Sequence, residues 1–494
     1  MLTSRQAIKD IARWNDSVAP VLDMGDLSDE AGAALLRDNR VRGTETELRA
    51  AAREFGGHPL ALGLLASFLK ETQGGDVRRR DHVRGLLDDP ENPRHDHAKR
   101  VMESYDAEWL ANRPVPHAIM HIVGLFDRPA SEDCLGALRR KPAIPGLTDA
   151  IVDLDEAEWR RAVVRLGDMR LLAPQDPTAP DALDAHPLVR EWFGHRLEDT
   201  NPEAWRAAHG RLYEHLRDTT QEGEAPTLAA LGPLYQAIPH GCRAGRHQEV
   251  LEKIYMDRIC RRRGDGEIEF YAVNKLGVIG SNLAAISWFF EKPYETPIAT
   301  LTPVSQAWTI NQAAFALRTQ VRFAEAMPTI RAGLRMEIEA KNWLGAAISA
   351  SHLSQAAMTV GELAAAVATA EQSVAYADQS GNEVQIIRRR TFHAHVLHVT
   401  GHRDKAESLF AAALQRQKRW QPEHPFLYGA QSRRYCDLLL AKGEGAAACD
   451  SGVGWVAILA CQHRQRQLDP RPRPSPNGAS EERIAYAPGW DCAR

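Results

Sequence analysis

The stretch FGGHPLAL at residues 55–62 lies between two helical patterns and decides how the first part of this chain folds. Ahead of it, the residues TETE at 44–47 fit a capping box that precedes apolar positions at helical spacing. Gly56 and Gly57 form a natural helix end, because glycine readily adopts the left-handed backbone of a C-cap. Pro59 suits the first turn of a following helix, where its missing N–H costs nothing. The segment therefore predicts a helix, a tight turn and a second helix.

Toward the N-terminus, the sequence predicts one more helix and two short strands. Ser28 fits an N-cap, and Asp29 and Glu30 favour the helix dipole from the first turn. The residues LTSR at 2–5 fit the end of a buried strand, and VLDM at 21–24 has strand character.

Toward the C-terminus, a polar stretch over residues 72–97 precedes a helix that starts near Ala98. Residues 117–197 then predict helices, a short strand at 169–172 (MRLL) and a proline-rich turn at 174–180. The motif HPLVR follows at 186–190. Three helices followed by a two-stranded wing is the order of elements in a winged-helix domain, which this segment therefore predicts.

Residues 203–449 are rich in Ala and Leu and carry an internal repeat. The repeat consists of a small residue, a Gly or its substitute seven residues later, and an Ala five residues after that. In the three clearest sets the final alanines are 40 residues apart. The sets are Ala314/Val321/Ala326, Ser354/Gly361/Ala366 and Ala394/Gly401/Ala406, with a weaker Cys436/Gly443/Ala448. A glycine at the turn and small residues between helices predict stacked helical hairpins, with Phe410 and Ala413 at packing positions. The pattern resembles the tetratricopeptide repeat in a longer form.

Composition places the chain among ordinary soluble proteins, with 44% hydrophobic and 26% charged residues. The 61 basic and 65 acidic residues nearly balance, which gives no general reason to expect a nucleic-acid or membrane partner. We find no apolar run near membrane-spanning length and no secretory signal. Seven cysteines without a CxxC motif favour reduced thiols, a cytoplasmic location and no structural zinc site.

The segments together resemble the STAND class of signal-transduction ATPases, and more narrowly its NB-ARC type with C-terminal tetratricopeptide repeats. The resemblance implies a mainly α fold: a residual strand, a helical lid, a winged-helix domain and a repeat solenoid. The expected domains are a nucleotide-binding remnant at 1–26, the lid at 27–112, the winged helix at 113–202, linker helices at 203–300, repeats at 301–449 and a disordered tail at 450–494. The tail interrupts the fourth hairpin, which a truncated or frame-shifted gene end would explain, as would a variable tail.

The resemblance also implies residues that contact ADP or ATP. Arg5 would reach the terminal phosphate, Gly57 and Pro59 form a GxP motif whose proline packs on adenine, and His186 would contact the β-phosphate. The family's usual aspartate at the end of the histidine motif is absent, since Pro187 follows directly. Residues 241–246 (GCRAGR) look like a linker helix with a packing role. A surface strand end, a plain Gly-Pro junction and a structural histidine remain the alternatives.

The phosphate-binding loop of this family is missing from the sequence. A GxxxxGK[ST] loop needs a Gly-Lys dipeptide, and the chain has none. No strand with acidic residues for magnesium precedes residues 2–5 either. We therefore expect no ATP hydrolysis by this chain, weak ADP or ATP binding and no metal ion.

Other clusters of histidine or arginine are weaker evidence for a functional site. His393, His395, His398 and His402 are more typical of packing than of a zinc site. The runs 261–263 and 388–390, three arginines each, are typical of solvated helix ends. The candidate DNA-recognition segment 156–169 carries Arg160, Arg161 and Arg165, but neighbouring acidic residues cancel their field.

Three hypotheses follow. The first is the sensor part of a nucleotide-switched regulator, with a protein or peptide ligand on its repeats and a homo-oligomer in the intact protein. The second is a non-enzymatic repeat scaffold (an adaptor) with an inert N-terminal remnant. The third and weakest is a winged-helix transcription regulator that contacts DNA.

Overall fold

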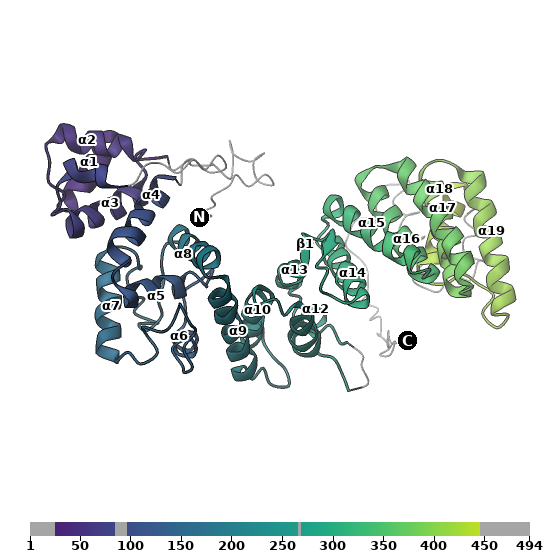
Figure 1. The fold of residues 1–494 in the computed structure, drawn as a ribbon. Coiled ribbons are helices and arrows are strands. Elements are labelled where there is room, and N and C mark those ends of the chain that lie inside the picture. The colour runs from purple at the N-terminus through teal and green to yellow at the C-terminus, as the bar shows by residue number, and fades with distance from the viewer. Residues whose placement is uncertain (1–24, 84–95, 265–267, 445–494) are drawn as a thin grey trace, which may run out of the picture. The chain divides into compact units, whose positions relative to one another are not determined.

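The computed structural model describes residues 25–83, 96–264 and 268–444. The described chain is mostly helical, which confirms the mainly α class (Figure 1). It divides into two compact units: unit 1 runs to Pro293 and includes Pro297–Ser305, and unit 2 is Tyr294–Thr296 with the residues from Gln306 on. No described helix has both the length and the apolar character needed to cross a bilayer. The predicted strands at 2–5 and 21–24 and the predicted tail at 450–494 lie outside the described residues.

The first part of unit 1 is a group of short helices. They are α1 (Asp29–Asp38), α2 (Glu45–Glu54), α3 (Pro59–Thr72), η2 (Val77–His82), α4 (Asp96–Ser104) and η3 (Tyr105–Leu110). The Ser28 hydroxyl accepts a hydrogen bond from the Ala31 N–H, and Thr44 and Glu47 form the reciprocal capping box. These predicted helix starts are confirmed.

The turn between α2 and α3 depends on its glycines. Gly56 and Gly57 have φ angles of 62° and 64°, in the left-handed region. A Cβ on Gly57 would lie 2.2 Å from the Leu27 carbonyl oxygen, so no larger residue fits. The Leu27 N–H donates to the Gly57 carbonyl at 2.9 Å, which fixes the start of α1 against this turn. Pro59 is the first residue of α3, as predicted.

The second part of unit 1 contains three helices, a looped hairpin and a fourth helix. The helices are α5 (Pro114–Val123), α6 (Glu132–Leu138), α7 (Glu156–Asp168) and α8 (Pro187–Thr200). At the base of the hairpin the Ala173 N–H donates to the Asp184 carbonyl at 2.8 Å, and near its tip the Ala179 N–H donates to the Asp176 carbonyl at 3.0 Å. Ala130 and Leu183 exchange two further backbone hydrogen bonds, 2.8 and 3.0 Å long.

The predicted strand at 169–172 is wrong, because these residues form the turn that ends α7. Arg170 adopts a left-handed φ of 59°. The N–H groups of Leu171 and Leu172 both point back to the Leu166 carbonyl, at 3.1 and 3.3 Å. The two leucines are buried at 0% and 5% exposure, so their apolar character reflects a packed turn.

The rest of unit 1 is again helical. It comprises α9 (Pro202–Thr219), α10 (Leu228–Arg243), α11 (His247–Glu249), η4 (Val250–Ile259), α12 (Tyr271–Asn274) and α13 (Ile279–Ser287). Two short strands, β1 (Phe290–Lys292) and β2 (Thr296–Pro297), then pair with each other. Gly241, within the predicted linker segment, lies in the last turn of α10 against Tyr213 and Val250, and the chain turns at Gly245.

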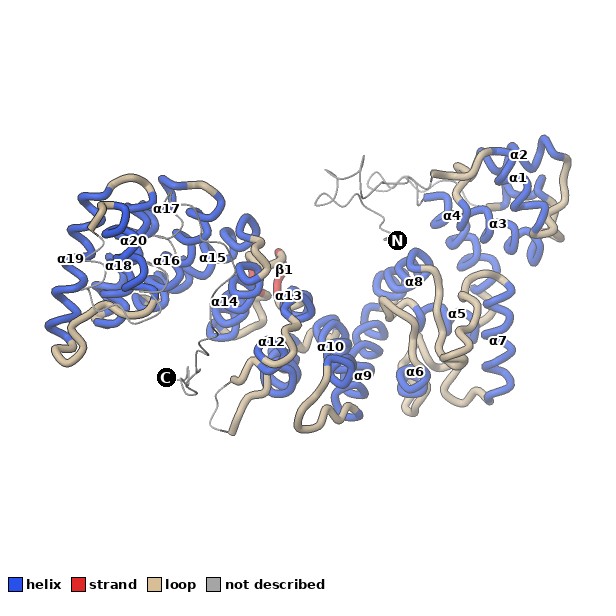
Figure 2. The backbone as a smooth tube through the Cα atoms, turned by 180° about the vertical axis from the view of Figure 1, so that it is seen from behind, coloured by secondary structure: helices blue, strands red, loops and turns tan. Residues whose placement is uncertain are grey.

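The helices from α14 onward form antiparallel hairpins that stack side by side, as Figure 2 shows for α16 to α19. Their bounds are α14 (Pro303–Thr319), α15 (Phe323–Glu339), α16 (Trp343–Val360), α17 (Leu363–Ser380), α18 (Glu383–Val399), α19 (Arg403–Trp420) and α20 (Ala430–Ala441). The turn positions of the three repeats, Val321, Gly361 and Gly401, have φ angles of 63°, 89° and 88°. The final alanines of the sets, Ala326, Ala366 and Ala406, are completely buried between helices. These three predicted hairpins are therefore confirmed, while Ala448 of the weaker fourth set lies outside the described residues.

Candidate functional site

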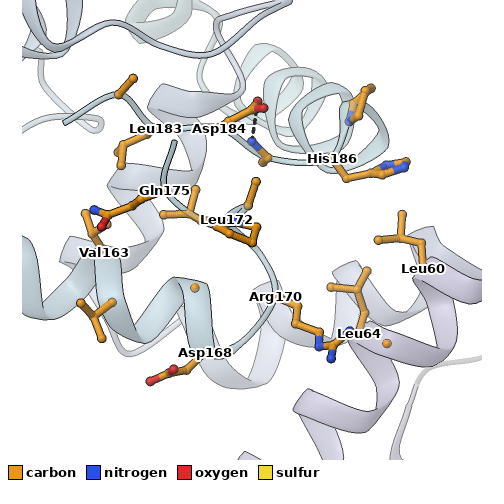
Figure 3. A pocket seen from close by; sticks show the side chains of 18 of the residues that line it. Leu60, Leu64, Val163, Asp168, Arg170, Leu172, Gln175, Leu183, Asp184 and His186 are labelled. Atoms are coloured by element: carbon orange, nitrogen blue, oxygen red, sulfur yellow. Dashed lines mark hydrogen bonds between the residues drawn. The ribbon is translucent and has the colours of Figure 1, made fainter. Parts of the chain in front are cut away.

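A pocket of about 790 Å³ lies in unit 1 between the start of α3, the end of α7 and the start of α8 (Figure 3). Pro59 and His186 both line it, although they come from separate sequence motifs. Gly57 is not part of the lining, since it packs against the Leu27 backbone. Arg5 lies outside the described residues. The structure thus brings two of the four predicted contact residues to one cavity.

The same three residues, His-Pro-Leu, begin two of the three helices that border the pocket, α3 and α8. His58 accepts a hydrogen bond at Nδ1 from the Ala61 N–H, and His186 accepts one at Nδ1 from the Leu188 N–H, each 3.3 Å long. The proline of each triplet is the first residue of its helix. The repeated triplet was a signal in the sequence that the two helix starts share one local structure.

Two helix N-termini border the pocket and favour negative charge beside them, while Asp168, at the end of α7, and Asp184 place acidic side chains elsewhere in the lining. Pro59 and Leu60 belong to the first turn of α3, and Pro187 belongs to that of α8. Each helix N-terminus carries roughly half a positive charge, which favours anionic groups nearby.

Arg170 supplies a full positive charge to the same pocket, and sequence reasoning missed it. It is the only Arg or Lys in the pocket lining. Its guanidinium donates to Asn39 Oδ1 at 2.6 Å and lies beside Gly63, where a Cβ would be 3.4 Å from Nη1. Figure 3 shows the Arg170 side chain beside Leu64 of α3. The left-handed turn that places Arg170 is invisible in the sequence, but a glycine within the apolar helix α3 was a clue to a close approach.

The remaining walls of the pocket are largely apolar. Leu64, Leu172 and Leu183 are 0–5% exposed and line it together with Leu60 and Val163. Asp184 reaches the lining as well, but its carboxylate accepts from the Ala185 N–H at 2.8 Å and pairs with Arg190. An apolar wall beside a few cationic and amide groups suits a ligand with a flat ring and an anionic end.

The arginines of the candidate DNA-recognition helix, α7, all have acidic partners. Arg160 pairs with Glu156 at 2.9 Å, Arg161 lies 4.0 Å from Glu158, and Arg165 pairs with Glu71 of α3. This pairing adds a structural reason to the sequence argument against DNA contact.

Among the described residues, two groups of three side chains place metal-ligating atoms close together. One is Asp133, Cys134 and His215, in which burial raises the pKa of the Cys134 thiol to about 11 and His215 bonds to Asp133 at 3.1 Å. A protonated thiol is a poor ligand. The other group is Asp106, His117 and His121, on η3 and α5. The histidines of α18 form no such group.

No protein-family model matches this chain, and neither does any curated protein. Two solved structures match this chain at low scores. BtubC (BKLC) from P. vanneervenii is 12% identical, with a TM-score of 0.29 over 58% of this chain and 100% of that one. A STAND signal-transduction ATPase with a tetratricopeptide repeat sensor from Pyrococcus horikoshii is 12% identical, with a TM-score of 0.28 over 90% and 73%. Similarity at this level carries no functional argument.

Proposed function

We propose that this chain is the sensor and interaction part of a nucleotide-switched regulator of the STAND type. One observation carries the proposal. Pro59 and His186, assigned to nucleotide contact from two motifs far apart in the sequence, line the same pocket. Its volume of about 790 Å³ is within the range of sites that hold drug-sized or nucleotide-sized ligands.

The pocket chemistry suggests how an adenine nucleotide would lie in it. The adenine ring would pack against Pro59 and Leu60, which offer partly exposed apolar surface at the start of α3. The diphosphate would lie toward His186 and Arg170, where a helix N-terminus and a guanidinium favour negative charge. The chain lacks a phosphate-binding loop, so we propose binding without hydrolysis.

A ligand in this pocket would link the two parts of unit 1. Its lining comes from α3 in the first part and from α7 and α8 in the second. A nucleotide that contacts both parts would favour one arrangement of them over another, which is what a two-state switch requires. The stacked hairpins α14 to α19 would offer their surface to a protein or peptide partner whose binding biases the same equilibrium.

Calorimetry with ADP on the full chain tests the proposal. We expect binding in the micromolar range, weakened about tenfold or more by Pro59→Ala, His186→Ala or Arg170→Ala. Pro202→Ala is the matched control for the proline, since Pro202 also begins a helix but does not line the pocket. His195→Ala is the control for the histidine, on the exposed side of α8. A folded chain that binds no ADP would instead favour the repeat scaffold with an inert N-terminal part.

A further inference from the structure

Three metal-ligating side chains meet in unit 1 away from the pocket at α3 and α8. Asp106 lies in η3, and His117 and His121 lie one helical turn apart on the same face of α5. The ligand atoms of the three residues all lie within 4.8 Å of one another. The histidine rings are 4.3 Å apart between centroids, and α5 packs directly against η3.

The converging polar atoms of this group contact one another or have no partner at all. Asp106 Oδ1, His117 Nε2 and His121 Nε2 are all buried without a hydrogen-bond partner. His117 Nε2 lies 2.9 Å from Asp106 Oδ1, so an ion pair between these two could account for their approach. It leaves His121 unexplained, because this side chain is only 7% exposed and its Nε2 has no partner. A buried polar atom left unsatisfied costs about 1–3 kcal/mol, and a single cation would satisfy all three.

The protonation states suit a cation. Burial lowers the pKa of His121 to about 4, with His117 adding to the effect, so its imidazole is neutral at physiological pH. Burial alone would raise the pKa of Asp106, but His117 and Arg196 together hold it below the usual value. Arg196 of α8 donates to Oδ2 of Asp106 at 3.1 Å, while Oδ1 is the oxygen nearest His117. A second carboxylate contact of this kind orients a ligand without occupying the ligating atom.

The spacing is close to that of a zinc site. Ligands at about 2.0–2.1 Å around a tetrahedral Zn²⁺ lie roughly 3.3 Å apart, which small side-chain rotations here would reach. The His117 side chain is 34% exposed, so the group lies close to the surface although its Nε2 is buried. Two imidazoles and a carboxylate are ligands that divalent transition metals prefer.

We propose that Asp106, His117 and His121 form a binding site for a divalent transition metal ion of the Zn²⁺ type. The ion would tie η3, at the end of the first part of unit 1, to α5, at the start of the second part. Its role would be to fix the junction of these two parts. The proposal does not rest on nucleotide binding, and it departs from the sequence analysis, which expects no metal.

The test uses the full chain, freed of metal with a chelator and titrated with Zn²⁺ by calorimetry and with Co²⁺ by absorption. We expect one equivalent to bind, with visible Co²⁺ bands and a higher thermal midpoint in Zn²⁺. His117→Gln and His121→Gln should each weaken binding at least about tenfold and abolish the thermal shift. His117→Gln changes a partly exposed side chain, so it tests the site even if the buried His121 variant fails to fold. His195→Gln, an exposed histidine on α8, should bind like the wild type.

Two results would overturn the proposal. One is a folded wild-type chain that binds neither ion, or that binds them equally well in both site variants. The other is a thiolate-to-cobalt absorption band that disappears in Cys134→Ser. That band would place the ion at Asp133, Cys134 and His215 instead.

Discussion

At the residue scale, this chain depends on a few backbone conformations that only some side chains tolerate. The three repeat turns require left-handed backbone, and two of them have glycine there while the first has Val321. A β-branched residue in this region is strained by roughly 1–2 kcal/mol relative to glycine. The Val321 side chain is 71% exposed, so it gains little from packing in return.

Val321→Gly should therefore stabilise the hairpin of α14 and α15 by about 1 kcal/mol. Hydrogen exchange in the peptides of both helices, together with thermal unfolding, would measure the change. Val399→Gly is the control, because Val399 is an exposed valine in the last turn of α18 and glycine there should destabilise by about 0.5–1 kcal/mol. Equal effects of the two substitutions would contradict strain at residue 321.

Gly57→Ala should destabilise unit 1 far more than Gly56→Ala. Both positions have a left-handed φ, but a Cβ on Gly57 meets the Leu27 carbonyl oxygen at 2.2 Å, whereas one on Gly56 meets only the His97 side chain at 2.8 Å. The backbone contact cannot relax without moving the start of α1. We therefore expect Gly57→Ala to lower the free energy of unfolding by more than about 2 kcal/mol, and Gly56→Ala by about 1 kcal/mol. Urea unfolding of the two variants tests this order, and a larger loss for Gly56→Ala would refute it.

At the element scale, the sequence predicted the helices whose start and end signals are local. Ser28, Thr44 with Glu47, and Pro59 begin helices because the chemistry of capping involves only neighbouring residues. The hairpins were predictable because the repeat marks each turn and each close contact. The strand expected at 169–172 failed because a buried apolar run has no periodicity that separates a strand from a packed turn.

One buried hydrogen bond in the second hairpin links the first and last residues of its repeat set. The Ser354 hydroxyl donates to the Ala366 carbonyl at 2.6 Å, between α16 and α17. Ser354→Ala should lower the free energy of unfolding of unit 2 by about 1 kcal/mol, because a buried hydrogen bond between two helices is lost. Ser408→Ala is the control, since its hydroxyl bonds only within its own exposed helix turn. Chemical denaturation that finds the two variants equally stable would show that this bond does not hold the hairpin.

At the scale of the whole molecule, both the pocket and the metal cluster depend on contacts that the sequence could not reveal. Arg170 reaches the pocket from a left-handed turn, and Asp106 reaches the α5 histidines from a neighbouring helix. Neither proximity has a signature in local spacing. The family resemblance did point to Pro59 and His186, and their contact with nucleotide stays a prediction.

Because both units contain buried neutral histidines, we expect the stability of the fold to decrease as the pH falls. Burial lowers the pKa to about 2 for His209 and about 3 for His240 in unit 1, and to about 3 for His352 in unit 2. Unfolding lets each take up a proton below its ordinary pKa of 6.5, so stability is lost as the pH falls from there toward the folded pKa. Thermal midpoints measured between about pH 7.5 and 4.5 should decrease steadily. His209→Gln should make the midpoint of unit 1 less dependent on pH, whereas the control His195→Gln, at an exposed position, should not. A wild-type midpoint that does not change with pH would contradict the account.

Photolabelling with 8-azido-ADP, followed by peptide mapping, tests the central claim most directly. The reactive group sits on the adenine ring, which the proposal places against Pro59 and Leu60, so the account predicts adducts among the lining residues of α3 and α7 and their loss when ADP competes. Adducts confined to other segments, or adducts that ADP does not displace, would contradict a nucleotide site between α3, α7 and α8.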